Sequence, residues 1–197
     1  MQTTFDFQDG KGPVPAHRHI NPDGSQGGWV ADTAYVAPTA YVSVDARVFG
    51  KAQIYADAEV YENARVYGYA KVYDKAQIYG NALVYDHADV YGNATVFGNT
   101  KIFGNAEVFG YTEIHNNTQI YDNAKVFDSA FVLDNSQVFG HAKVFGYTSL
   151  TYKSKVSGYS YVFHQCSIEI NQIVHNQILS DYNNPIKELY KRFGNDI

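Results

Sequence analysis

The sequence predicts an all-β solenoid, and a six-residue repeat carries this prediction. Val, Ile or Leu stands at every sixth position from Val36 to Val162, in 22 of 22 cases. Ala, Thr or Ser stands two residues before each of them, from Ala34 to Ser160. A period of six fits neither an α-helix nor a plain two-residue alternation, so each unit must contain a short strand and a corner. This period is typical of a parallel β-helix, in which three units complete a triangular coil of about 18 residues.

The residue types within each unit fit the inside and the corners of such a prism. The small residue and the aliphatic residue are two positions apart, so they point to the same side of an extended segment. The two corner positions that follow are rich in Gly, Asn and Asp, as in Gly80-Asn81 and Gly104-Asn105. These residues tolerate the positive φ that a tight corner requires. The repeat runs without interruption over residues 34–167 and predicts about seven coils.

The two ends of the chain differ from the repeat. Residues 1–33 are rich in Gly and Pro and predict an irregular N-terminal cap, with Phe5, Phe7 and Trp29 covering the open end of the solenoid. Residues 168–197 predict a C-terminal cap. Within it, Asn184-Pro185 is a typical helix start, which predicts a short α-helix over 186–193.

The hexads, for example those at 65–70 and 71–76, resemble the hexapeptide-repeat superfamily of left-handed β-helices. Aromatic residues stand where that family often has Gly or Ala. The segment 9–19 and the following 27–31 resemble the opening of hexapeptide-repeat proteins encoded by phages and prophages. The resemblance implies a left-handed coil, a homotrimer and a host protein as partner, with inhibition of that protein as one role.

Composition narrows the function classes. The formal net charge of −5 argues against nucleic acid as the main partner. The single cysteine, Cys166, excludes an intramolecular disulfide and favours a cytoplasmic location, in the host cytoplasm if the protein is phage-encoded. No apolar run is long enough for a membrane span, and the first residues lack the features of a secretory signal.

Aromatic residues form the most prominent outward pattern. Directly after the aliphatic position, 16 of the 20 residues from Phe49 to Phe163 are Tyr or Phe. Residues 18 apart should stack along one face, which predicts three columns. The candidate interaction residues are Tyr55, Tyr73, Tyr91, Phe109, Phe127 and Phe145 of the second column, with Tyr67 and Tyr85 of the first. The change from Tyr to Phe along the second column predicts that one end is drier than the other.

Three interpretations of these columns stay open at this point. The stacked rings stabilise the coils, or they form an interface with other copies or a protein partner, or they bind a ligand such as a glycan. We expect a non-catalytic, oligomeric binding or scaffold protein, with self-association in trimers favoured and a host protein as a further partner. No cofactor is expected for this role.

Two histidine patterns give the alternative functions, which are acyl transfer and metal binding. The segment 162–168 resembles a hexad of some acyltransferases, which implies acyl-CoA as cosubstrate and His164 as general base, although Gln165 replaces the usual Asp. His17 and His19 form a His-x-His pair that could bind a metal, particularly if three chains met there. No third ligand lies at the usual spacing, so we expect no metal and expect these rings to hydrogen-bond within the cap.

Overall fold

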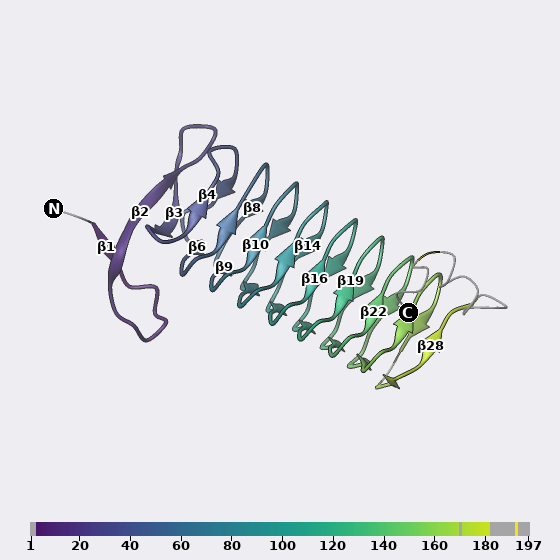
Figure 1. Cartoon of the computed structure of the whole chain (residues 1–197). Helices are drawn as coiled ribbons and strands as arrows, with labels where there is room; N and C mark the ends of the chain where they lie inside the picture. Colours follow the sequence, from purple (N-terminus) through teal and green to yellow (C-terminus); the bar gives the residue numbers. More distant parts are fainter. Residues whose placement is uncertain (1–2, 170, 182–191, 193–197) are drawn as a thin grey trace.

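The computed structural model is an elongated solenoid with one sheet along each side, parallel except at the N-terminal end of the first sheet (Figure 1), and it describes residues 3–169, 171–181 and 192. The first sheet contains β1 (Thr4–Phe5), β2 (Val14–Ile20), β3 (Gln26–Ala31), β6 (Arg47–Val48), β9 (Arg65–Val66), β12 (Leu83–Val84), β15 (Lys101–Ile102), β18 (Gln119–Ile120), β21 (Gln137–Val138), β24 (Lys155–Ser157) and β27 (Ile173–His175). The second sheet contains β4 (Tyr35–Val36), β7 (Gln53–Ile54), β10 (Lys71–Val72), β13 (Asp89–Val90), β16 (Glu107–Val108), β19 (Lys125–Val126), β22 (Lys143–Val144), β25 (Tyr161–Val162) and β28 (Ile178–Leu179). The third sheet contains β5 (Tyr41–Val42), β8 (Glu59–Val60), β11 (Gln77–Ile78), β14 (Thr95–Val96), β17 (Glu113–Ile114), β20 (Phe131–Val132), β23 (Ser149–Leu150) and β26 (Ser167–Ile168).

The strand register confirms that each hexad forms one side of the prism. Val72 lies opposite Ile54 on one side and Val90 on the other, so residues 18 apart are neighbours in parallel strands. The third sheet provides one strand per coil, and its eight strands therefore correspond to eight coils. This is one more than the sequence predicted. The pairing of strands is the same for either hand, so the left hand remains a prediction from resemblance.

The parallel pairing extends beyond residues 34–167 at both ends. In the first sheet, β3 pairs in parallel with β6, which places Val30 opposite Val48. At the other end, β27 and β28 continue the first and second sheets, with Val174 opposite Val156. The predicted helix over 186–193 lies outside the described residues except for Arg192, which is helical.

The interior is dry and narrow, as the repeat predicts. The aliphatic residues of successive coils stack in ladders such as Val84, Ile102 and Ile120, each fully buried. Between the ladders lie small residues, mostly Ala. Where Thr replaces Ala, its hydroxyl group can be satisfied locally: Thr118 Oγ1 donates to the carbonyl of His115 at 2.6 Å. Close packing of this kind leaves little room for larger side chains.

The corners have the positive φ that the sequence predicted. At the second position after the aliphatic, φ is +72° at Gly68 and +60° at Asp74. A Cβ added to Gly68 would lie 2.8 Å from the backbone nitrogen of Asp86, so this corner has no room for a side chain. Acidic corner residues link neighbouring coils: Asp74 Oδ2 accepts a hydrogen bond from the Gly92 N–H at 3.1 Å.

The N-terminal cap is built differently from the prediction. Phe5, Phe7 and Trp29 do not cover the end of the interior, because they extend the outer side of the first sheet: Phe7 stacks on Phe49 with ring centroids 4.8 Å apart. The strands β1, β2 and β3 form an antiparallel hairpin region before the first coil. Two buried polar side chains of this region cover the edge of the third sheet. Asn21 Oδ1 accepts from the Val42 N–H at 2.9 Å.

Candidate binding surface

The first two predicted aromatic columns are present as ring stacks, the second from Tyr73 onward. Tyr55 is not part of that stack, because its ring is tilted against Tyr35, with centroids 5.2 Å apart. In the second column, successive rings from Tyr73 to Phe163 have centroids 4.7–4.9 Å apart and lie within 7° of parallel. The first column runs from Phe49 through Tyr67 and Tyr85 to Phe139 with centroids 4.8–5.0 Å apart. These separations exceed the ~3.5–4.0 Å of optimal carbon–carbon contact. Neighbouring rings are therefore offset, and each leaves part of one face uncovered.

The exposure of the second column changes along its length. Tyr55 is 37% exposed and Tyr73, Tyr91 and Phe109 are half-buried. Phe127 and Phe145, which the sequence placed on an open surface, are instead buried, at 5% and 1% exposure. Among the described residues, Tyr161 and Ile178 pack with these rings, and Arg192 lies against them. The sequence had predicted a drier end, and the phenylalanine end is the buried one.

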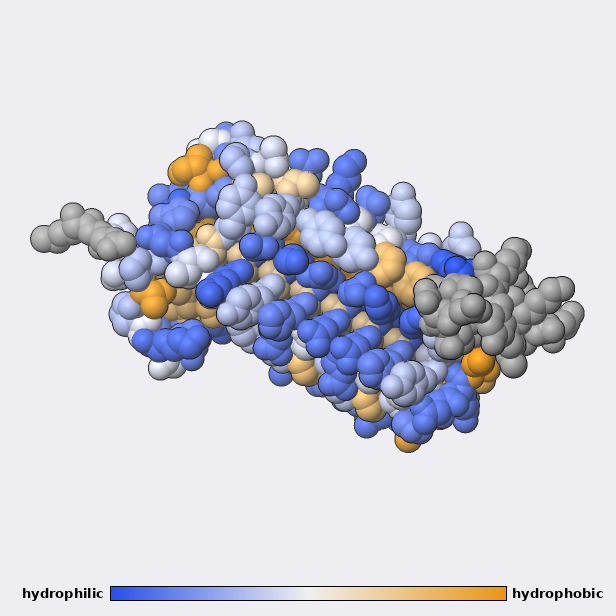
Figure 2. Space-filling model, in the orientation of Figure 1, coloured by the Kyte–Doolittle hydropathy of each residue, from blue (hydrophilic) through white to orange (hydrophobic). Residues whose placement is uncertain are grey.

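The space-filling view shows a change in hydropathy in the same direction. Figure 2 shows a row of side chains along the long axis that turns from pale blue to orange toward the C-terminal end. Tyrosine is slightly hydrophilic and phenylalanine hydrophobic, so this is the change expected of the second column. We define the open part of this column, Tyr55, Tyr73, Tyr91 and Phe109, as the open aromatic face.

Carboxylates surround the open aromatic face. Burial raises the pKa of Tyr73 to about 12, and the negative charges of Asp89, Asp74 and Glu107 add to this shift. The pKa of Tyr91 is raised for the same reasons, burial first. Glu107 is paired with Lys125 at 2.7 Å, whereas Asp89 carries no such ion pair among the described residues. The face therefore combines offset rings with acidic side chains.

The polar corner columns are explained by contacts within the chain. In one of them, Asn81 donates to Asn99 and Asn99 donates to Asn117, each at 3.1 Å. In another, His87 stacks on Tyr69 with ring centroids 4.8 Å apart, and His141 stacks on Tyr159 at 4.7 Å. These histidines serve as stacked rings in their corner column.

His164 occupies a corner of the last coils and has a partner that the sequence did not indicate. Its Nδ1 pairs with the carboxylate of Asp181, which supplies the acid that Gln165 does not. This pairing could not be predicted, because the two residues lie in coils where the six-residue spacing is no longer regular. Burial raises the pKa of the Cys166 thiol, and Asp181 adds to this shift, so the neighbouring cysteine is held in its neutral form.

The two N-terminal histidines contact different partners. His17 Nδ1 lies 2.9 Å from Asp32 Oδ1, on the exposed side of β2. His19 is buried, and its Nε2 donates to the carbonyl of Ala40 at 3.0 Å. The described ranges contain no group of three or more His, Cys, Asp or Glu side chains that could hold a metal ion.

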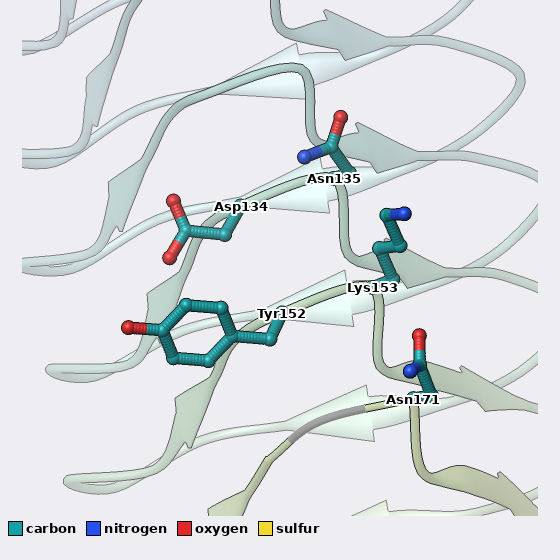
Figure 3. A pocket seen from close by; sticks show the side chains of 5 residues that line it. All are labelled: Asp134, Asn135, Tyr152, Lys153 and Asn171. Carbon is teal, nitrogen blue, oxygen red and sulfur yellow. The ribbon is translucent and has the colours of Figure 1, made fainter.

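A pocket of about 640 Å³ lies at a corner near the C-terminal end (Figure 3) and is lined by Asp134, Asn135, Tyr152, Lys153 and Asn171. Figure 3 shows that Asp134 and Tyr152 point to one side while Lys153 and the two asparagines point to the other. The backbone itself links these corners, because the Lys153 N–H donates to the carbonyl of Asp134 at 2.9 Å. Since the side chains diverge, the pocket does not bring reactive groups together.

These features define a β-solenoid repeat protein with external aromatic stacks. Residues 76–89 match the family model described as the YdcK beta-solenoid repeat, a short stretch of the second, third and first sheets. This chain is similar to that family over those residues. A comparison with curated proteins found no match. No helix within the described residues is long and apolar enough to cross a membrane.

Proposed function

We propose that the protein is a non-catalytic binding or scaffold protein that takes up a protein partner on the open aromatic face. One observation supports this proposal: Tyr55 is exposed and Tyr73, Tyr91 and Phe109 are half-buried, while the rings further along the same column are buried. Tyrosine is enriched in protein interfaces because its ring is apolar and rigid and its hydroxyl can still bind water or a partner. The eight-coil prism would hold these rings at fixed spacing.

The partner we propose first is another copy of the chain, in a homotrimer as the resemblance implies. A host protein is the second candidate, and the phage or prophage setting of similar proteins favours it. In that setting the protein would act in the host cytoplasm. The single cysteine is compatible with such a reducing compartment.

Replacing Tyr73 and Tyr91 together with serine is expected to abolish assembly or partner capture while the solenoid stays folded. Central aromatic residues of an interface each contribute about 2 kcal/mol or more, so the affinity should fall at least about 30-fold for each ring. Light scattering gives the mass of the assembly, a pull-down from host lysate tests the partner, and circular dichroism checks the fold.

The matched control replaces Tyr152 and Tyr159 with serine. These residues are more exposed, at 60% and 67%, but lie at corners of the prism and not in the second aromatic column. We expect the control to keep the mass and the partner of the wild type. If the Tyr73/Tyr91 variant keeps them as well, the aromatic columns are structural and the proposal is wrong.

The His164–Asp181 pair favours acyl transfer as a second candidate function. A carboxylate at Nδ1 orients an imidazole for general-base catalysis. If the protein uses acyl-CoA, saturation at about 100 times Kd should stabilise it by about 2.7 kcal/mol and raise Tm by several degrees. His164→Gln should then lower acyl transfer by about 10²-fold or more. An unchanged Tm at saturating acyl-CoA would exclude this function.

A further inference from the structure

The chain contains an arginine site on its own second sheet. The guanidinium group of Arg192 pairs with the carboxylate of Asp128. Its Cζ lies 4.7 Å from the ring centroid of Phe145 and 5.5 Å from that of Phe127. A cation within about 6 Å of an aromatic centroid is attracted by the ring. We call Asp128, Phe127 and Phe145 the occupied cradle.

The same arrangement recurs three coils earlier on the same sheet. Asp74 follows Tyr73 as Asp128 follows Phe127, and Tyr91 lies one coil further along as Phe145 does. The ring centroids of the pair are 4.7 Å apart here and 4.8 Å apart in the occupied cradle. We call Asp74, Tyr73 and Tyr91 the open cradle.

The two acidic side chains of these cradles are held in the same way. Asp74 Oδ2 accepts the Gly92 N–H at 3.1 Å, and Asp128 Oδ2 accepts the Gly146 N–H at 3.2 Å. In both cases the carboxylate lies at the corner edge of the ring stack, and in the occupied cradle Arg192 pairs with this same Oδ2. Asp74 is exposed, and no cation among the described residues lies within ion-pair distance of it.

The charges beside the open cradle favour a cation more strongly than those beside the occupied one. The strand residues next to Phe127 and Phe145 are Lys125 and Lys143, and Arg192 binds there nevertheless. At the equivalent positions beside Tyr73 and Tyr91 stand Lys71 and Asp89. One lysine is thus replaced by a carboxylate, which lowers the cost of bringing in a positive charge.

The chain has no free arginine that could fill the open cradle from within. It contains four arginines, Arg18, Arg47, Arg65 and Arg192. Arg18 donates to the carbonyls of Gly27 and Val44. Arg47 donates to Gln8, and Arg65 donates to the carbonyl of Phe7. Arg192 fills the occupied cradle.

We infer that the open cradle is a binding site for an arginine side chain of a host protein, the second partner proposed above, because all four arginines of this chain already have partners of their own. The guanidinium group would pair with Asp74 and lie against the uncovered ring faces of Tyr73 and Tyr91. This inference rests on the proposed function and names the chemistry by which the open aromatic face selects its partner. An arginine suits the site better than a lysine, because its planar group can stack on rings while it pairs with a carboxylate.

The test uses a short acetylated and amidated Gly-Arg-Gly peptide on the full-length protein, with matched peptides that carry lysine or the neutral isostere citrulline. We expect a Kd of the order of 1 mM for the arginine peptide, because one side chain contributes little affinity. The lysine peptide should bind more weakly, and the citrulline peptide should not bind measurably. The NMR signals of the Tyr73 and Tyr91 rings, assigned by Tyr→Phe variants, should shift on titration.

Asp74→Asn should weaken the arginine peptide at least about tenfold, because the neutral amide loses the charged hydrogen bond. The fold should persist, since the amide oxygen can still accept the Gly92 N–H. Asp86→Asn is the control: Asp86 accepts the Gly104 N–H in the same way, but it lies beside the Tyr85–Phe103 ring pair of the first sheet, away from the open cradle. We expect the affinity for the arginine peptide to be unchanged in this variant. Arg192→Gln should raise the number of peptides bound per chain by one, because it empties the occupied cradle.

Equal binding of the citrulline peptide, or unchanged affinity in Asp74→Asn, would overturn the inference. The proposed function has a separate readout, because assembly and partner capture depend on both rings. If Asp74→Asn loses neither assembly nor partner while Tyr73→Ser/Tyr91→Ser loses them, only the arginine site is wrong. If arginine binding holds but assembly and capture survive the loss of both rings, the proposed function is wrong.

Discussion

Replacing Ile102 with alanine is expected to destabilise the solenoid by about 2–5 kcal/mol. Ile102 is fully buried at the middle of the prism, between Val84 and Ile120 of the neighbouring coils. The coils are held by a backbone ladder on three sides, so they cannot move inward to fill the cavity. The lost contacts and the remaining cavity therefore both contribute. Urea denaturation followed by circular dichroism measures the free energy of unfolding.

Two variants make this measurement specific to the interior. Ile102→Val removes one methylene group and should cost about 0.5–1.5 kcal/mol. Lys101→Ala, on the exposed side of the same strand, should change the free energy of unfolding by less than about 0.5 kcal/mol. Equal effects of Ile102→Ala and Lys101→Ala would contradict the inward orientation of the aliphatic ladder.

The prism could be predicted from the sequence because each hexad repeats the same order of small, aliphatic and corner residues. A residue such as Val72 is inside because its position two after Ala70 fixes its side of the strand, and its neighbours 18 residues away are inside for the same reason. Corners such as Gly68 could be predicted because few residues tolerate positive φ. The ring columns follow directly from that register.

The parts that could not be predicted depend on contacts outside the repeat. The burial of Phe127 and Phe145 involves Arg192, which stands far along the chain and shows no periodic relation to them. The pairing of His164 with Asp181 crosses a coil in which the hexads have become irregular. The N-terminal cap could not be predicted either. Asn21 lies at the edge of the third sheet because of a hairpin whose sequence has no repeat.

The interior and the exterior of this solenoid therefore have different roles. The interior contains nearly identical small and aliphatic residues in every coil. These residues determine the fold. The exterior uses the same aromatic position in every coil but varies its neighbours, from Lys71 and Asp89 to Lys125 and Lys143. Under the proposed function, selectivity between otherwise equal ring stacks would come from these flanking charges, and Asp89 beside Tyr91 is why we propose the partner site there.

Raising the pH above 10 is expected to destabilise the protein through its stacked tyrosines. Burial raises the pKa of Tyr73 to about 12, and nearby carboxylates add to the shift. Burial also raises the pKa of Tyr85 to about 12, with Tyr67 and Asp86 contributing. The pKa of Tyr61 is raised to about 12 by burial and by its hydrogen bond to Glu59. These rings keep their protons in the folded state at a pH where the unfolded chain has lost them.

The sign of the effect follows from proton linkage. Between the ordinary tyrosine pKa of 10.0 and the folded value of about 12, the unfolded state binds fewer protons than the folded state. The free energy of unfolding must therefore fall as the pH rises through this window, and the contribution is fully present below it. Urea midpoints at about pH 8 and about pH 11 measure this fall, and tyrosinate absorbance follows the ionisation.

The matched control replaces Tyr61, Tyr73 and Tyr85 with phenylalanine, which the chain itself uses at equivalent positions such as Phe109. The rings remain stacked but can no longer ionise, so the fall between pH 10.0 and about 12 should be smaller than in the wild type. Lysines also lose their charge in this range, and the comparison with the triple variant separates their effect. If both proteins lose stability in parallel, or if all tyrosines of the folded protein ionise in one step near 10, the rings are not shielded and the open aromatic face is fully hydrated.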